Sequence, residues 1–200
     1  MALNFANNNS LSAITTKPSG LSGGALNLIS TQTASSSSTI SFTSGIDDTY
    51  DSYVFKFYDI HPATDGADFQ VNFRDGGSAY DATKTTTVFR AIHNEDDDSA
   101  SLTYSSFMDQ AQSTGIQAIS TSLGADADQQ LSGTMQLFSP ASTTFVKHFM
   151  TDTNMYSNSN FSVRYFVAGY CNVTAAIDGV QFSMSSGNID SGVIKLYGIS

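Results

Sequence analysis

Apolar side chains in this sequence recur at every second position, in short runs that end at turn-forming residues. From Tyr53 to Phe57, three aromatic residues alternate with Val54 and Lys56, and residues 69–74 alternate in the same way. Successive side chains of a β-strand point to opposite faces of its sheet, so this pattern predicts strands with one buried face. The other runs with the composition and length of strands are 39–43, 88–93, 102–107, 131–138, 144–150, 162–172, 180–184 and 192–199.

The segments between these runs are rich in Gly, Asn, Asp, Ser and Pro, which favour chain reversals. Many short strands without intervening helices predict an all-β chain with two antiparallel sheets packed face to face. We therefore expect a jelly-roll-like antiparallel β-sandwich of about ten strands over residues 39–200, with an orthogonal barrel as the alternative. Lone cations are expected to deter unwanted edge pairing from within predicted strands: Lys56, Arg74, Arg90, Lys147, Arg164 and Lys195.

The first 38 residues differ from the rest of the chain, because clusters of Asn, Gly and Ser replace the alternating pattern. Their apolar side chains are too sparse to form a core of their own. We expect residues 1–38 to be an extended assembly arm that is held by a neighbouring subunit. The alternative is an irregular edge strand along their own domain. The apolar residues expected to make the contacts of the arm are Leu3, Phe5, Leu11, Ile14, Leu21, Leu26, Leu28 and Ile29.

The chain is strongly acidic, with 8 Lys and Arg against 18 Asp and Glu and a formal net charge of −10. Nucleic-acid phosphates and anionic lipid surfaces repel such a chain, so we expect neither as a partner. No run approaches the roughly 20 apolar residues that cross a bilayer. Residues 1–20 also lack the basic start and apolar centre of a signal peptide. We expect a soluble protein that is not secreted by that route.

Candidate catalytic groups are few and scattered. The three histidines, His61, His93 and His148, are the only side chains that act as bases near neutral pH, and the sequence contains no Gly-x-Ser-x-Gly elbow. The single cysteine, Cys171, ends an aromatic run, which indicates a small buried thiol. One cysteine forms neither an intramolecular disulfide nor a thiolate metal cage. We expect no enzymatic activity and no cofactor.

Two groups of loop residues are candidates for binding without chemistry. The run Asn94–Asp98 offers several hard oxygen ligands, but it lacks the central Gly and the terminal Glu of an EF-hand loop. We expect a solvated turn there, with a calcium-dependent module as the alternative. Tyr and Asn side chains on loops are expected to contact sugars if the chain is a receptor- or carbohydrate-binding adhesin: Tyr80, Asn154, Tyr156 and Asn158.

The C-terminal third carries a distinctive order of segments: Phe166–Tyr170, then Thr174–Phe182, then Ser186–Ile199, which ends in Leu-Tyr-Gly-Ile. This order resembles the ending of structural proteins from tailed bacteriophages, particularly those of marine and cyanobacterial phages. Upstream, the run Tyr53–Ile60 followed by Phe69–Gly77 resembles the first hairpin of that family. The resemblance covers these two blocks, and the first 38 residues show none.

The resemblance implies a virion component, such as a head decoration, a fibre or a tail part, with no enzymatic role. It also implies symmetric assembly, often trimeric, with copies of itself and with other virion proteins. The chain would be made in the host cytoplasm and reside in the phage particle. In a fibre, the loop Tyr and Asn residues would contact a glycan on the host surface.

Overall fold

The structure is a computed structural model that describes residues 25–199, and within this range the chain forms twelve strands and no helix. The all-β prediction is confirmed. Ten strands correspond to predicted runs, whereas β1 lies in the expected arm and β7 has only two residues. The strands are β1 (Leu26–Ser37), β2 (Thr39–Phe42), β3 (Ser52–Pro62), β4 (Phe69–Arg74), β5 (Lys84–Asn94), β6 (Ala100–Tyr104), β7 (Gln117–Ala118), β8 (Leu131–Phe138), β9 (Lys147–Tyr156), β10 (Phe161–Cys171), β11 (Gly179–Met184) and β12 (Ile189–Ile199).

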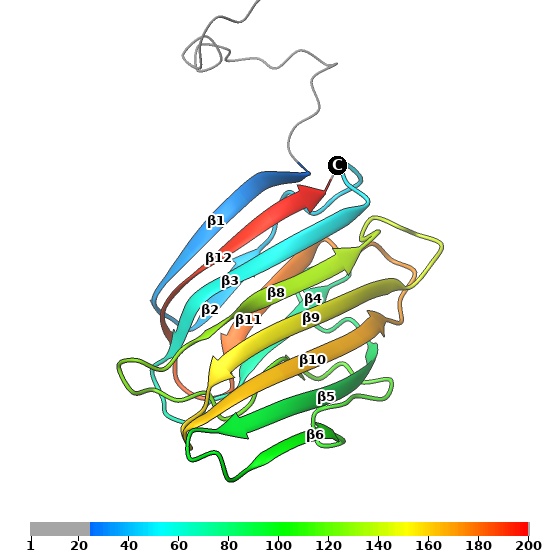
Figure 1. Cartoon of the computed structure of the whole chain (residues 1–200). Coiled ribbons are helices and arrows are strands. Elements are labelled where there is room, and N and C mark those ends of the chain that lie inside the picture. The colour runs from blue at the N-terminus through cyan, green and yellow to red at the C-terminus, as the bar shows by residue number, and fades with distance from the viewer. Residues whose placement is uncertain (1–24, 200) are drawn as a thin grey trace, which may run out of the picture.

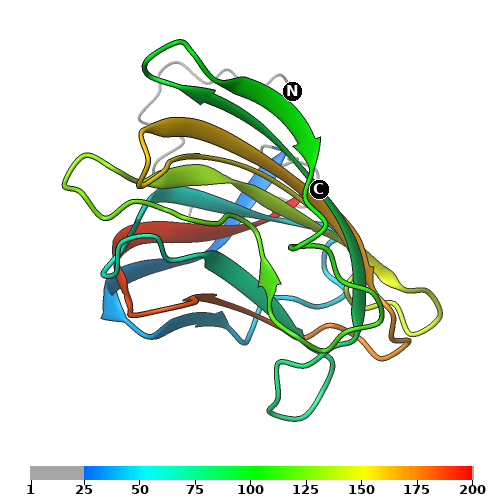
Figure 2. The same cartoon turned by 90° about the horizontal axis from the view of Figure 1, so that it is seen from below.

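Two antiparallel sheets make up the fold (Figure 1). The larger sheet has the strand order β1-β12-β3-β8-β9-β10-β5-β6, and the smaller has the order β2-β11-β4-β7. Figure 2 shows the two layers from below. The chain crosses repeatedly from one sheet to the other, from β2 through β5 and again from β10 through β12, as in a jelly roll. The predicted antiparallel sandwich is therefore confirmed.

The core lies between the sheets and is dominated by phenylalanine. Phe182 of β11 is at its centre, fully buried, and its ring lies 5.5 Å from Phe55, 5.2 Å from Phe57 and 5.7 Å from Phe69. Phe55 and Phe57 belong to β3 of the larger sheet, so Phe182 of the smaller sheet packs between aromatic side chains of both layers. Offset and edge-on ring pairs of this kind add to the stabilisation that burial alone provides.

Strand β1 changes the expected domain boundary. Residues 26–37 pair with β12 along their whole length, from Leu26 opposite Ile199 to Ser37 opposite Ile189. Residues 26–37 therefore form an edge strand of their own domain, which was the alternative to the predicted arm. Backbone pairing with β12 explains the difference, because it requires no alternation of side chains. The other expected arm residues, Leu3, Phe5, Leu11, Ile14 and Leu21, lie outside the described residues.

The apolar residues of β1 also differ from one another in their surroundings. Leu26 and Leu28 remain exposed, whereas Ile29 packs against the core. The register of β1 against β12 shifts between Leu28 and Ser30, which places Ile29 at an irregularity of the strand. Only one of these three residues is therefore used by its own domain.

The expectation that strand cations guard the sheet edges is wrong. The edge strands are β1 and β6 in the larger sheet and β2 and β7 in the smaller, and none of them contains a charged residue. The cations lie in interior strands instead. Lys147 on β9, for example, is buried, and its ammonium group donates hydrogen bonds to the carbonyl oxygens of Ser142, Phe145 and Val173. It satisfies loop carbonyls that would otherwise lack partners.

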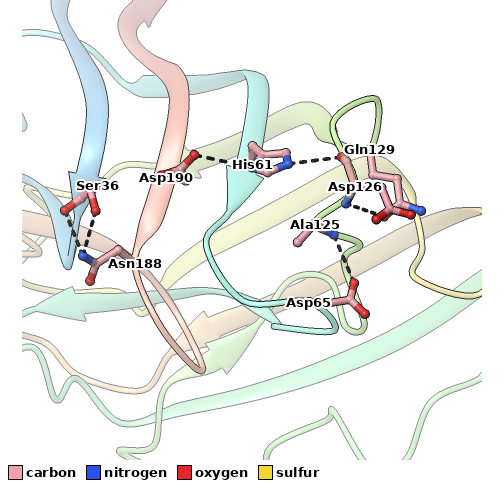
Figure 3. Close-up of polar contacts among 8 residues, drawn as sticks. All are labelled: Ser36, His61, Asp65, Ala125, Asp126, Gln129, Asn188 and Asp190. Atoms are coloured by element: carbon pink, nitrogen blue, oxygen red, sulfur yellow. Dashed lines mark hydrogen bonds and ion pairs between the residues drawn. The ribbon is translucent and has the colours of Figure 1, made fainter.

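Side chains tie together the turns at one end of the sandwich (Figure 3). The Nε2 atom of His61, near the end of β3, lies 3.2 Å from the carbonyl oxygen of Asp126, and its Nδ1 atom lies 3.8 Å from a carboxylate oxygen of Asp190. Asn188 donates hydrogen bonds from Nδ2 to the carbonyl and hydroxyl oxygens of Ser36. These contacts hold the end of β1, the start of β12 and the loop before β8 against one another.

Candidate functional site

The outer face of the larger sheet, which is turned away from the smaller sheet, carries most of the exposed side chains that could recognise a partner. Strand β9 illustrates how the sequence builds it, because its side chains alternate strictly between the core and this face. The side chains of β9 on the outer face are His148, Met150, Asp152, Asn154 and Tyr156. Three different surfaces follow one another along these strands.

The first surface is an apolar groove with a volume of about 610 Å³. Its lining includes Phe138 of β8, His148 and Met150 of β9, and Ala168 and Tyr170 of β10. Ala168 lies opposite Met150 in the register, and its small side chain leaves the space between the larger neighbours open. The rings of His148 and Tyr170 meet edge-on with 5.9 Å between their centroids. We call this hollow the apolar groove.

A second hollow, of about 510 Å³, adjoins the apolar groove and shares Phe138 and His148 with it. Phe145, just before β9, also lines this hollow, and 73% of its surface is exposed. Met150 on the rim of the apolar groove is 55% exposed. Apolar side chains this exposed and this close together are typical of surfaces that bind a partner.

The second surface is a rigid group of charged and aromatic side chains at the centre of the outer face. Arg164 of β10 donates two parallel hydrogen bonds to the carboxylate of Asp152 on β9, at 2.8 Å and 2.6 Å. This pairing raises the pKa of Arg164 above its usual value. The guanidinium lies 4.6 Å from the ring centroid of Phe166, and Phe166 stacks on Phe89 of β5 at 4.8 Å. These side chains hold one another in place, and we call them the ledge.

The third surface is a polar hollow of about 490 Å³ that contains two of the predicted ligand-contact residues. Asn154 and Tyr156 both line it, together with Gln130 and Asp128. The hydrogen bond to Glu95 and the nearby carboxylates raise the pKa of the Tyr156 hydroxyl. Both predicted residues lie on β9 and not on a loop, and strict alternation brings them to the same face.

The other two predicted ligand-contact residues lie elsewhere. Asn158 follows β9 and lines a separate hollow with Tyr165. Tyr80 lies in the segment between β4 and β5, where its ring is 5.8 Å from the guanidinium carbon of Arg74. The structure thus gathers Asn154 and Tyr156 into one site and leaves Asn158 and Tyr80 out of it.

Beneath the outer face, one row of the larger sheet holds a thiol between two buried ammonium groups. Cys171 of β10 is paired with Lys84 of β5 on one side and with Lys147 of β9 on the other. Burial raises the pKa of Cys171 to about 12 and lowers the pKa of Lys84 to about 8. Cys171 is buried, as the sequence predicts, whereas nothing in the sequence around Lys84 marked it as buried. Lys84 donates to the carbonyl oxygen of Gly115 at 2.6 Å and so anchors that loop.

The acidic run before β6 closes on itself. Asn94 accepts hydrogen bonds at Oδ1 from the backbone N–H groups of Asp98 and Ser99, and His93 Nε2 lies 3.1 Å from Asp97 Oδ1. Within residues 25–199, no three His, Cys, Asp or Glu side chains are grouped so that they could hold a metal ion. The backbone forms the turn that the sequence predicts there.

The three histidines lie far apart in the fold. His61 belongs to the tied turns, His93 contacts the acidic run, and His148 lines the apolar groove. Each therefore has a local role in the architecture or on the surface.

No protein-family model matches the chain, and no curated protein or solved structure matches it. Over residues 25–199, no helix has the length and apolarity needed to cross a membrane. The resemblance to phage structural proteins remains a prediction from the sequence.

Proposed function

We propose that this chain is a non-enzymatic structural protein of a bacteriophage virion, placed as a head decoration, a fibre or a tail component. It assembles with copies of itself, as a trimer or another symmetric oligomer, and with other virion proteins. The observation that carries the proposal is that all four edge strands of the sandwich lack charged residues. Proteins that remain monomeric usually protect such edges with charges, proline, bulges, very short strands or a covering segment. Strand β1 has a bulge, and β2 and β7 are short, whereas β6 pairs with β5 without a register shift.

Strand β6 is the clearest case. Asn94 donates its N–H to Ser99, and Ser105 donates its N–H to Val88, which places the odd-numbered residues of β6 in hydrogen-bonded pairs with β5. The backbone groups of the even-numbered residues therefore point to the free edge. Every residue of β6 is exposed, and Leu102 is 71% exposed. An edge that is apolar, uncharged and open supports a role in assembly.

The N-terminal segment provides the second support. Within the described part of the chain, the core cluster is formed by residues from Ala34 to Leu196, and they come from both sheets. Residues 1–24 contain Leu3, Phe5, Leu11, Ile14 and Leu21 among polar and small residues. Because β1 belongs to the sandwich, the proposed assembly arm is confined to these 24 residues.

Deletion of residues 1–24 tests the proposal. The shortened chain should melt cooperatively, close to the Tm of the full chain, because its core is intact. Supplied in trans to a phage that lacks the gene, it should be missing from purified virions, whereas the full chain should be present. Mass spectrometry of the particles measures both. Incorporation of the shortened chain at the level of the full chain would contradict the assembly arm, and absence of the full chain from purified virions would contradict the proposed function.

The polar hollow and the ledge favour a second candidate function, binding of a host-surface glycan. Sugar recognition commonly combines a flat aromatic surface with amide and carboxylate groups, and Phe166, Asp152 and Asn154 provide them on the outer face. On a glycan array, the purified chain should bind a defined sugar, and Tyr156→Ala should weaken binding. Tyr80→Ala, which lies outside the hollow, is the matched control. The absence of saturable binding to any sugar would remove this candidate.

A further inference from the structure

The apolar groove of the outer face has no occupant within the described part of the chain. Its exposed surface is almost entirely apolar, and the side chains that form it come from β5, β8, β9 and β10. Its volume of about 610 Å³ is in the range of pockets that enclose a ligand of several apolar groups. Water in such a groove is displaced favourably by apolar side chains.

We propose that the apolar groove of one copy binds residues 1–24 of a neighbouring copy. The inference rests on the proposed function, in which residues 1–24 are the assembly arm, and it names the surface to which the arm binds. Leu3 and Phe5 are two residues apart, so both side chains point to the same side when the backbone is extended. They are the strongest candidates to enter the groove, where Ala168 leaves space between Met150 and Tyr170.

Charge favours this occupant. Lys17 is the only charged side chain among residues 1–24, whereas the whole chain has a net charge of −10. Two copies therefore repel each other through their acidic bodies. Residues 1–24 carry no acidic side chain, so the arm does not add to this repulsion. No Asp, Glu, Lys or Arg lines the apolar groove, so binding there removes no charge from water.

The length of the arm allows the contact. The described chain begins next to Leu26 on β1, an edge strand of the larger sheet, where Leu26 is paired with Ile199. An extended segment of 24 residues spans up to about 80 Å, at about 3.3 Å per residue. The groove begins at β8, three strand spacings or roughly 14 Å from β1 within one sheet. The arm is therefore long enough to leave its own domain and reach the groove of another copy.

The exposed side chains around β6 are a less suitable receptor for the arm. Leu102 and Tyr104 are 71% and 56% exposed on a strand at the edge of the sheet, and neither lines the apolar groove. They fit strand pairing better than the capture of isolated side chains.

Binding of a labelled synthetic peptide of residues 1–24 to the chain that lacks these residues tests the inference. The chain that lacks them retains every residue of the described core, so it serves as the receptor. Fluorescence polarisation should show saturable binding. Ala168→Trp, which fills the groove, should weaken it about 10- to 100-fold, the change expected when one Leu or Phe side chain loses its site. Ala91→Trp introduces the same side chain on β5, on the same outer face of the larger sheet, and should leave the affinity within about twofold.

A mixing experiment tests whether the arm and the groove are the two halves of one contact, and sedimentation of the full wild-type chain tests whether that contact joins two copies. Full chain that carries Ala168→Trp has an arm but no groove, and the wild-type chain without residues 1–24 has a groove but no arm. Sedimentation velocity should show that neither associates alone and that the mixture does. Association of the full Ala168→Trp chain by itself would show that the apolar groove is not the binding site of the arm. It would not contradict the assembly arm. Peptide binding together with a full wild-type chain that sediments as a monomer would show that the arm occupies its own groove, and would overturn the neighbouring-copy proposal.

The two proposals fail in different ways. If Ala168→Trp has no effect on peptide binding or on association while loss of residues 1–24 still prevents virion incorporation, the groove is wrong and the proposed function holds. If loss of residues 1–24 affects neither association nor incorporation, the assembly arm is wrong. If the full chain is absent from purified virions, the proposed function itself is wrong.

Discussion

The two faces of strands β9 and β10 are made of similar residues that serve opposite purposes. On the inner face, Phe149 and Val167 are buried in the core, and even Lys147 has its ammonium group satisfied by carbonyl oxygens. On the outer face, Met150 and Phe166 lie one register position away and remain at least partly exposed. The inner face therefore explains why the chain folds, and the outer face carries the surfaces that we propose for binding.

The largest effect should come from the inner side of the sandwich. Phe182→Ala removes the ring around which both layers pack, and it should lower the free energy of unfolding by about 3–5 kcal/mol. Chemical denaturation followed by circular dichroism measures it. Met150→Ala on the outer face is the control and should change stability by less than about 0.5 kcal/mol. Equal losses for the two variants would contradict the division between the faces.

A smaller effect concerns pH and the buried row of Lys84, Cys171 and Lys147. Burial lowers the pKa of Lys84 from 10.5 to about 8 in the folded chain. Between these two values the unfolded chain binds more protons than the folded chain, so the contribution of Lys84 to stability rises with pH. From pH 8 to pH 9, wild type should gain about 1 kcal/mol or less relative to Lys84→Met.

Cys171 acts in the opposite direction at higher pH. Its pKa is about 12 in the folded chain against 9.0 in the unfolded chain, so above pH 9 the folded chain binds more protons and loses stability. Repeating the Lys84 comparison in a Cys171→Ala background removes this contribution. If wild type and Lys84→Met show the same dependence on pH in that background, the burial of the Lys84 ammonium group does not affect stability.

The smallest effect on stability is expected at the ledge. Arg164→Ala breaks the ion pair with Asp152, but the pair is exposed, and exposed ion pairs contribute little. The Tm should therefore stay close to that of wild type, as measured by differential scanning fluorimetry. Binding of a glycan at the ledge should nevertheless be lost. Lys195→Ala removes a positive charge from β12, on the same face of the sheet, and controls for the change of charge. A large drop in Tm would mean that the ledge serves the fold and not recognition.

The sequence predicts the sandwich because half-buried strands impose their period on the side chains. Phe55 and Phe57, for example, alternate with Val54 and Lys56, and β3 places the two sets on opposite faces. The closing turn was also predictable, since Gly187 has a φ of +68°, which glycine adopts without strain. The many Ser and Thr residues of β1 give it no alternating pattern in the sequence, and its strand conformation depends on pairing with β12.

The sites were less predictable, because they depend on which strands become neighbours. Asn154 and Tyr156 could be selected as exposed polar and aromatic residues, but the apolar groove joins Phe138, His148 and Ala168 from three different strands. No local pattern marks such a set. The position of a strand at an edge is likewise a property of the sheet order, which explains why the interpretation of the strand cations failed.

The most direct test of the central claim is electron cryomicroscopy of a virion from a phage that encodes this chain. The density should contain the twelve-stranded sandwich in symmetric copies, with an extended segment from one copy in the groove beside Ala168 of the next. Homogeneous, infectious particles in which this sandwich is absent at every position would contradict the claim.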